Sequence, residues 1–277
     1  MNNKVVVCCV HGDPQKQVGA WRPYLLGKLL YSNNFEIKYQ HRISSDVAWY
    51  LELIKNLAWL RNGVFWYTAG PFRQVPFVLI VLSVFLRAKF VFDLRDGFSL
   101  NYLQFNGGRK TAKYWAASFV EYLIFFRCKK FVVTTEGNYR YYFNRFGSKV
   151  ELVPNGHTLS RRVMARSKST KKIGSQRLSA VCFGKFFEYG NSAIDAIANL
   201  EVNFSEYAEV VLHLIGSDPF LNESALSRLD SRVKVLIHPR MRYSLAARFL
   251  SQMDLGVCII RDPECDNGTK VYDYIGL

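Results

Sequence analysis

The stretch PFVLIVLSVFLRAKFVFDLRDG (residues 76–97) displays the pattern on which the predicted fold rests. An apolar segment, Pro76–Leu86, leads through a short basic break into a second apolar run, Lys89–Asp93, and a charged loop follows. Apolar runs without polar alternation are typical of parallel strands that are covered on both faces. The stretch therefore predicts a helix, a buried strand and a polar loop at the carboxyl end of that strand.

The same order of short apolar runs and longer helical patterns recurs along the chain. Strands are expected at Lys4–Val10, Glu36–Gln40, Val64–Thr68, Lys89–Asp93, Lys130–Thr134, Val150–Val153, Leu178–Phe183, Glu209–Ile215, Val233–Ile237 and Leu255–Ile260. Helices between them are expected at Trp21–Tyr31, Asp46–Arg61, Tyr114–Phe126 and Asn191–Asn199, among others. This alternation predicts the doubly wound α/β class, in which helices cover both faces of a parallel sheet.

One segment interrupts the alternation and divides the chain. Arg161–Arg177 is rich in cations, contains no acid and has little apolar content, which predicts a solvated linker, a patch that contacts phosphates or anionic lipid, or both. A length of 277 residues is sufficient for two domains. We expect an N-terminal domain at 1–157, a basic linker at 158–177 and a C-terminal domain at 178–277. The second domain is expected to be incomplete and the protein C-terminally truncated, because the sequence ends within a helical pattern.

The charge balance restricts the partners. The 37 Lys and Arg residues exceed the 22 Asp and Glu residues, and the resulting charge of +15 suggests nucleic acid, a phosphorylated substrate or a membrane surface. Pro76–Leu86 is too short to span a bilayer, which takes about 20 apolar residues. It is either a buried helix or, because Arg73, Arg87 and Lys89 flank it, a helix in the membrane interface. Nucleic-acid binding is disfavoured, because the cations are scattered and the aromatic residues follow helical spacing.

Several common site motifs are missing from the sequence. It contains no GxGxxG, GxxxxGK[ST], HExxH or GxSxG, and no DxD pair that would hold a divalent metal on a nucleotide diphosphate. Its six cysteines show no CxxC spacing, so a structural zinc site is not expected. They are too few for a disulfide scaffold, and we expect the protein to reside in a reducing cytosol. Dinucleotide binding, P-loop chemistry and metal-dependent transfer are therefore disfavoured.

Seven segments taken together are more informative. They are the N-terminal strand with Gly19 and the helix after it, KFVFDLRDGFSL (89–100), KKFVVTTEGNYRYYFNRFGSKVELVPNGHT (129–158), AVCFGKFFEYGNSAIDAI (180–197), LHLIGSDPF (212–220), IHPRMRYSLAARFLSQMDLGVCII (237–260) and NGTKVYDYIGL (267–277). In this order they resemble segments of the GT-B glycosyltransferases of family 4, also called glycosyl transferases group 1. The resemblance covers nearly the whole sequence. It implies a GT-B fold, with two facing doubly wound domains and the ligands at the carboxyl ends of the strands.

The resemblance places the donor in the C-terminal domain. It implies that Gly184 and Lys185 approach the diphosphate, that Thr269 and Lys270 address the phosphates from a helix N-terminus, and that Asp273 bonds the ribose. Pro239 and Arg240 would border the base. The family pattern has Lys where this sequence has Gly190, and Glu where it has Asp273. The structural alternatives to these donor-binding roles are that Lys185 is a plain exposed lysine of a loop, and that Lys270 and Asp273 form a surface ion pair.

In the N-terminal domain the resemblance implies an acceptor side. Asp96 would orient the attacking hydroxyl as the catalytic residue, with Asp93 and Arg95 beside it, Glu136 after the next strand, and Gly19 near the first. The alternative for Asp93, Arg95 and Asp96 is a structural network of salt bridges.

The function that these expectations imply is transfer of a glycosyl group from a nucleotide-diphosphate sugar to a growing, lipid-linked bacterial surface glycan. The family implies retention of configuration, with no metal and no cofactor. The expected partners are a nucleotide-sugar, a glycan or lipid-linked acceptor and an anionic membrane surface, with no nucleic acid. The expected location is cytoplasmic, with peripheral attachment to the inner face of the plasma membrane. The alternatives are a degenerate, non-catalytic member of the same fold and a nucleotide-sugar epimerase, which would need more acid and base groups.

Overall fold

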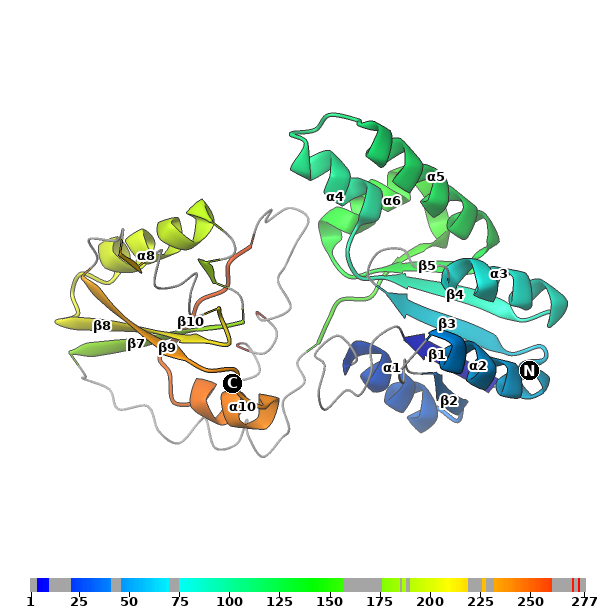
Figure 1. The fold of residues 1–277 in the computed structure, drawn as a ribbon, viewed down its shortest axis with the longest axis horizontal. Helices are drawn as coiled ribbons and strands as arrows, with labels where there is room; N and C mark the ends of the chain where they lie inside the picture. Colours follow the sequence, from blue (N-terminus) through cyan, green and yellow to red (C-terminus); the bar gives the residue numbers. More distant parts are fainter. Residues whose placement is uncertain are drawn as a thin grey trace. The chain divides into compact units, whose positions relative to one another are not determined.

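The computed structural model describes residues 4–9, 21–40, 46–69, 75–156, 176–184, 186–187, 190–218, 226–227, 232–260, 271 and 274. The protein divides into two compact units, Met1–Asn155 and Gly156–Leu277, each built on its own parallel sheet (Figure 1). The predicted α/β class with two parallel-sheet domains is confirmed.

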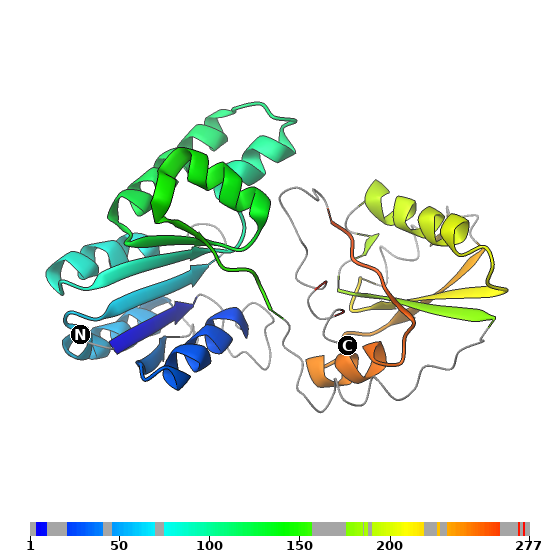
Figure 2. The ribbon, with the colours of Figure 1, turned by 180° about the vertical axis from the view of Figure 1, so that it is seen from behind.

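The N-terminal unit contains a sheet of six strands in the order β2-β1-β3-β4-β5-β6 (Figure 2). The strands are β1 (Lys4–Cys9), β2 (Glu36–Gln40), β3 (Val64–Ala69), β4 (Lys89–Leu94), β5 (Lys130–Val133) and β6 (Val150–Leu152). All neighbouring strands pair in parallel, with Tyr67 of β3 opposite Cys8 on one side and Phe92 on the other. The carboxyl ends of the six strands therefore meet at one edge of the sheet.

Helices connect these strands. They are α1 (Trp21–Ser32), α2 (Asp46–Leu60), α3 (Val75–Phe85), α4 (Phe98–Phe105), α5 (Ala112–Arg127) and α6 (Glu136–Phe146), and a 3₁₀ turn, η2 (Gly147–Lys149), follows α6. Leu53, Leu79, Ile124 and Tyr142, from α2, α3, α5 and α6, join one core cluster with the strands, so these four helices cover the same face. The strand order reverses at β1, which is the place where open α/β sheets bind ligands at their carboxyl edge.

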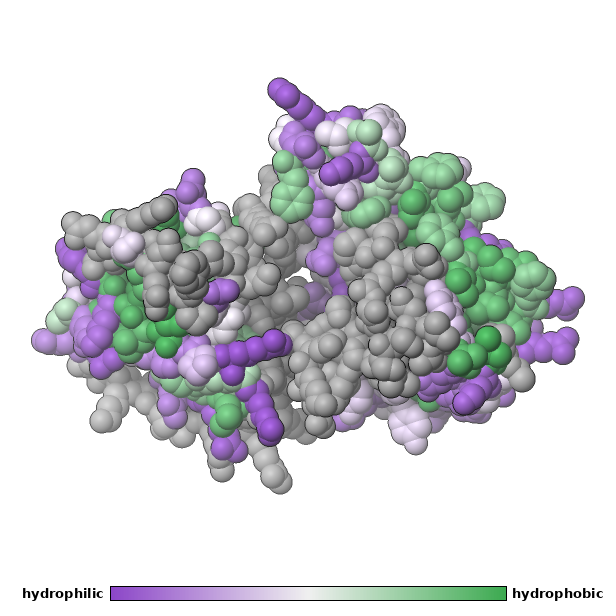
Figure 3. Space-filling view, viewed as in Figure 1, coloured by the Kyte–Doolittle hydropathy of each residue, from purple (hydrophilic) through white to green (hydrophobic). Residues whose placement is uncertain are grey.

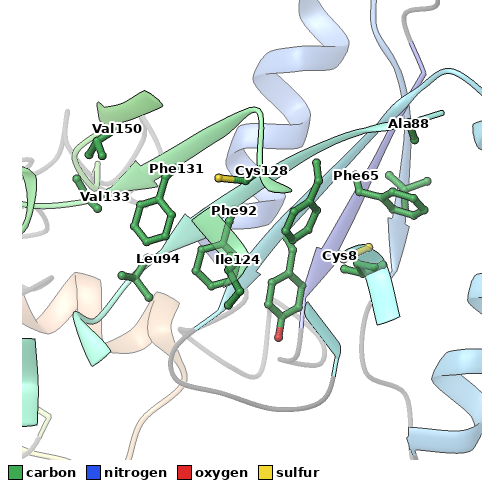
Figure 4. Packing of buried hydrophobic residues seen from close by; sticks show 14 of the residues in the cluster. Cys8, Phe65, Ala88, Phe92, Leu94, Ile124, Cys128, Phe131, Val133 and Val150 are labelled. Atoms are coloured by element: carbon green, nitrogen blue, oxygen red, sulfur yellow. The ribbon is translucent and has the colours of Figure 1, made fainter. Parts of the chain in front are cut away.

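Aromatic residues fill this core. Phe65, Phe90, Phe92 and Phe131 extend across neighbouring strands, and the Phe92 and Phe131 rings lie 5.5 Å apart (Figure 4). Each such ring removes a large apolar area from water, and truncating one to alanine typically costs about 3–5 kcal/mol. Because residues of central strands are buried on both faces of the sheet, these strands show the continuous apolar runs seen in the sequence.

The C-terminal unit contains four described strands in the order β10-β7-β8-β9, all parallel. They are β7 (Arg177–Phe183), β8 (Glu209–Ile215), β9 (Val233–His238) and β10 (Leu255–Gly256). Helix α8 (Asn191–Asn203) packs on one face through Ala193, Ile197 and Leu200, and α10 (Tyr243–Leu250) packs on the other through Leu250. The strand order reverses between β7 and β10, so this sheet has a switch point of its own.

All ten predicted strands are present, with small shifts at their ends. The largest differences are at β10, which is two residues long, and at Arg177, which was assigned to the linker but begins β7. Arg177 belongs to the strand because it lies opposite Glu209 and forms an ion pair with it at 3.6 Å. The rest of the predicted linker falls almost entirely on residues 157–175, outside the described part of the protein.

Helix α3 packs on the core with one side, as a buried helix should, and leaves apolar residues exposed on the other. Leu79 is fully buried in the core, whereas Phe77, Val81, Val84 and Phe85 are exposed on the outer side of the helix. None of the described helices combines the length and the apolar content that crossing a membrane requires.

Candidate functional site

Asp93 is the next-to-last residue of β4, and its carboxylate is fully buried. Arg22, near the start of α1, donates to it through Nε at 2.9 Å and through Nη2 at 3.0 Å, and the Thr68 hydroxyl donates at 3.0 Å. A buried carboxylate needs such a set of donors, because an unpaired charge in the interior is costly. Asp93 therefore has a structural role in holding Arg22, and it does not present an open carboxylate at the sheet edge.

Arg22 also fixes the end of the N-terminal unit. Its remaining N–H groups donate to the Val153 carbonyl at 2.9 Å, to the Pro154 carbonyl at 3.1 Å and to Asn155 Oδ1 at 3.2 Å. One guanidinium thus joins α1, the end of β4 and the segment after β6. The planar set of five donors on arginine suits this task, and lysine could not replace it.

Asp96 is exposed on the loop between β4 and α4, at the carboxyl edge of the sheet. The loop is fixed on both sides of it. The Thr134 hydroxyl donates to the Arg95 carbonyl at 3.0 Å, and the Phe98 amide donates to the Tyr142 hydroxyl at 3.2 Å. The predicted catalytic carboxylate is therefore held on a preorganised loop and remains accessible to solvent.

Glu121 of α5 holds the start of α4 and the Tyr142 hydroxyl in place. It is fully buried and accepts from the Ser99 amide at 2.9 Å, from the Tyr142 hydroxyl at 2.5 Å and from Arg145 Nη1 at 3.1 Å. Its carboxylate lies at the N-terminus of α4, where the helix dipole favours an anion and where the N-cap residue, Gly97, has no side chain to accept from the helix amides. Burial, followed by the nearby Glu121 carboxylate, raises the pKa of Tyr142 well above its usual value, so the phenol stays protonated as a donor.

The remaining predicted residues of the acceptor side are Glu136, Arg95 and Gly19. Glu136 is the first residue of α6, half-exposed, with a weak ion pair to Arg140 at 3.9 Å. Arg95 contributes its carbonyl to the Asp96 loop. Gly19 lies outside the described residues. Asp93, Arg95 and Asp96 are near neighbours in sequence at the end of β4, with Asp93 buried in the strand and Asp96 exposed on the loop.

In the C-terminal unit, Tyr274 marks the switch point between β7 and β10. Its hydroxyl accepts from the Phe183 amide at 3.1 Å and donates toward the Val257 carbonyl at 3.2 Å. Its ring lies directly against Gly256, where even a Cβ atom would come within 2.5 Å of it. Val271 and Tyr274 are helical, and Thr269, Lys270 and Asp273, which flank them in sequence, lie outside the described residues.

Three loops follow the carboxyl ends of β7, β8 and β9 and lie side by side. The Gly184 amide donates to the Ile215 carbonyl at 2.8 Å, and the buried Ser217 hydroxyl donates to the Gly184 carbonyl at 2.7 Å. Gly184 has φ +105° and Gly216 has φ +80°, conformations that favour glycine. The backbone of Arg240 packs beside Gly216. The predicted donor residues Gly184, Pro239 and Arg240 are thus at one edge, and Lys185 lies outside the described part of the protein.

Helix α8 begins next to this edge. Its N-cap is Gly190 with φ +61°, so its first amides find no side-chain acceptor at the N-cap. A positive φ is strained for lysine, so the departure from the family pattern at Gly190 follows from the local turn. An uncapped N-terminus of a helix of this length can accept an anionic group, provided that the loops supply cations.

A pair of histidines, His213 of β8 and His238 at the end of β9, joins the two strands directly before the Pro239–Arg240 loop. His213 Nδ1 and His238 Nε2 are 2.9 Å apart, and both rings contact Phe249 of α10. Burial, followed by the charges of His238 and Arg177, lowers the pKa of His213, so His213 is mainly neutral near pH 7. The two stacked rings therefore act as a packing element. Within the described residues, no group of three or more His, Cys, Asp or Glu residues is arranged to hold a metal ion.

No protein-family model matches the sequence, and no curated protein matches it. Solved structures of glycosyltransferases match its fold. An alpha-glucosyltransferase in complex with UDP and a 13-mer DNA containing an HMU base aligns at TM-score 0.58 and 10% identity, over 99% of this chain and 77% of that one. WaaG, a glycosyltransferase involved in lipopolysaccharide biosynthesis, aligns at TM-score 0.51 and 12% identity, over 99% and 78%. The fold is therefore the GT-B fold, with two parallel-sheet α/β units.

Proposed function

We propose that this protein is a glycosyltransferase that moves a sugar from a nucleotide-diphosphate donor to a lipid-linked bacterial surface glycan, with retention. The observation that carries the proposal is the edge of the C-terminal sheet. There the tight glycine turns at Gly184 and Gly216, the exposed Arg240 and the uncapped start of α8 come together. Backbone amides and a cation are what a diphosphate requires.

In this proposal each unit has a separate role. The C-terminal unit would bind the departing diphosphate, and the exposed Asp96 of the N-terminal unit would orient the acceptor hydroxyl. Stabilising the leaving group and positioning the nucleophile are sufficient for transfer without a metal. The similar alpha-glucosyltransferase structures, which contain UDP or UDP-glucose, support a nucleotide-sugar as the donor, and the similar WaaG structure, of a glycosyltransferase involved in lipopolysaccharide biosynthesis, supports a surface glycan as the product. We place the protein in the cytoplasm, attached peripherally to the inner membrane face, where a lipid-linked acceptor would reside.

The test of the proposal is a calorimetric titration of the full-length protein with UDP-, GDP- and dTDP-sugars. We expect one of these donors to release heat of binding. Arg240→Ala should lower the affinity of the protein for that donor by about tenfold, because a charge-assisted contact is lost. Arg248→Ala is the matched control, since Arg248 is also exposed but lies in the last turn of α10. Heat from none of the donors would favour a non-catalytic member of the fold.

Acceptor identity needs a separate measurement. The similar alpha-glucosyltransferase structure contains DNA. Sugar transfer from the donor is therefore measured with a membrane lipid extract as the acceptor and, separately, with duplex DNA as the acceptor. Product in the lipid phase supports the proposed acceptor, and product on DNA alone would refute it.

A further inference from the structure

Two neighbouring helices of the N-terminal unit expose apolar stripes to solvent. On α5 the exposed residues are Trp115, Phe119, Tyr122, Leu123 and Phe126, and on α3 they are Phe77, Val81, Val84 and Phe85. Both sets follow the spacing i, i+4, i+7, i+8, which places their members on one side of a helix. The helices pack against each other, and Figure 3 shows hydrophobic residues gathered over them. We call these residues the α3/α5 face.

The stripes are additional to the residues that hold the helices on the sheet. Leu79 of α3 and Ile124 of α5 are fully buried in the core, whereas Phe85, Phe119 and Phe126 are 80%, 63% and 73% exposed. Each helix is therefore apolar on two sides. Exposed apolar patches of this extent mark a surface that contacts a partner or a membrane.

Cations predominate among the exposed charged residues in the segments that adjoin α3 and α5 in sequence. These exposed cations are Arg87, Lys89, Arg109, Lys110, Lys113, Arg127 and Lys129, whereas Asp96 is the exposed acid between residues 75 and 135. The acids between residues 75 and 135 are Asp93, Asp96 and Glu121, and two of them, Asp93 and Glu121, are fully buried. An apolar surface that is rimmed by cations is complementary to a bilayer with anionic headgroups.

We infer that the α3/α5 face is the surface by which this protein docks on an anionic lipid bilayer. This inference rests on the membrane attachment proposed above and assigns it to particular residues. Trp115 and Tyr122 carry the amphipathic rings that favour the headgroup level, and the phenylalanines would enter the acyl boundary. A second copy of this protein fits less well, because a two-fold interface would set the same cationic rim against itself.

Flotation with vesicles tests the inference. We expect the full-length protein to float with vesicles of phosphatidylcholine and phosphatidylglycerol, less with phosphatidylcholine alone, and less at high salt. The double variant Phe119→Ser/Phe126→Ser should lose binding by at least about tenfold, because two large apolar groups no longer leave water. Val202→Ser is the matched control, since Val202 is 72% exposed on α8 of the other unit, and it should float like the wild type.

Two further readouts separate the alternatives. All five tryptophans lie within residues 1–155, so unchanged tryptophan fluorescence shows that the double variant keeps its N-terminal unit folded. Donor heat in calorimetry should be equal in all variants, which separates a failure of docking from a failure of the proposed transfer. The inference is overturned if the double variant floats like the wild type or if the wild type does not float. It is also overturned if sedimentation shows that the wild type is a dimer and the double variant is a monomer.

Discussion

Replacing Arg22 by alanine is expected to lower the free energy of unfolding of the N-terminal unit by about 3–5 kcal/mol, because it leaves the buried Asp93 carboxylate without its charged partner. The same change removes the donors to the Val153 and Pro154 carbonyls, so the segment after β6 loses its attachment to α1. Urea unfolding followed by tryptophan fluorescence measures this unit selectively, since every tryptophan lies in it.

Two matched variants show whether burial is the cause. Arg140→Ala breaks an exposed ion pair with Glu136 and should cost about 0–1 kcal/mol. Arg22→Lys keeps the charge but loses the fork of donors, so its cost should lie between the other two. If Arg22→Ala destabilised no more than Arg140→Ala, the structural role of the Arg22–Asp93 pair would be wrong.

Asp96→Asn is expected to lower kcat for sugar transfer by about 10²–10⁴-fold, the range for loss of a positioned acid or base group. The amide has nearly the same size but cannot accept a proton or align the acceptor hydroxyl through a full negative charge. Because Asp96 is exposed, the unfolding free energy should change by less than about 0.5 kcal/mol.

The controls for Asp96 separate chemistry from folding and donor binding. Asp195→Asn alters another exposed carboxylate, on α8 of the other unit, and should leave kcat unchanged. Donor affinity should be the same in both variants. A kcat within a factor of three of the wild type for Asp96→Asn would remove Asp96 from the mechanism.

The sequence was sufficient to predict the strands because they are buried on both faces. Lys89–Asp93 and Glu209–Ile215 read as continuous apolar runs for that reason, and they became β4 and β8 almost without change. Element ends were less predictable, because they depend on pairing. Arg177 joins β7 through its register opposite Glu209, which no local pattern reveals.

The residues that fix the candidate site were harder to find. An acid at the end of an apolar strand implies a buried partner for Asp93, but Arg22 is 71 residues away and has no local signature. Glu121 offered a weak signal, as a single acid in the aromatic helix α5. Its roles at the start of α4 and beside Tyr142 depend on tertiary contacts alone. The stripe on α5 follows a helical period that sequence alone would assign to a core.

Hydrogen exchange in the presence of donor tests the central claim, that the carboxyl edge of the C-terminal sheet binds the nucleotide diphosphate. Our account predicts slower exchange in peptides that contain Gly184, Ser217 and Arg240, and unchanged exchange in those that contain Arg177 and Val233 at the opposite edge. Donor binding without protection of the Gly184, Ser217 and Arg240 peptides, or with protection confined to residues 1–155, would contradict it.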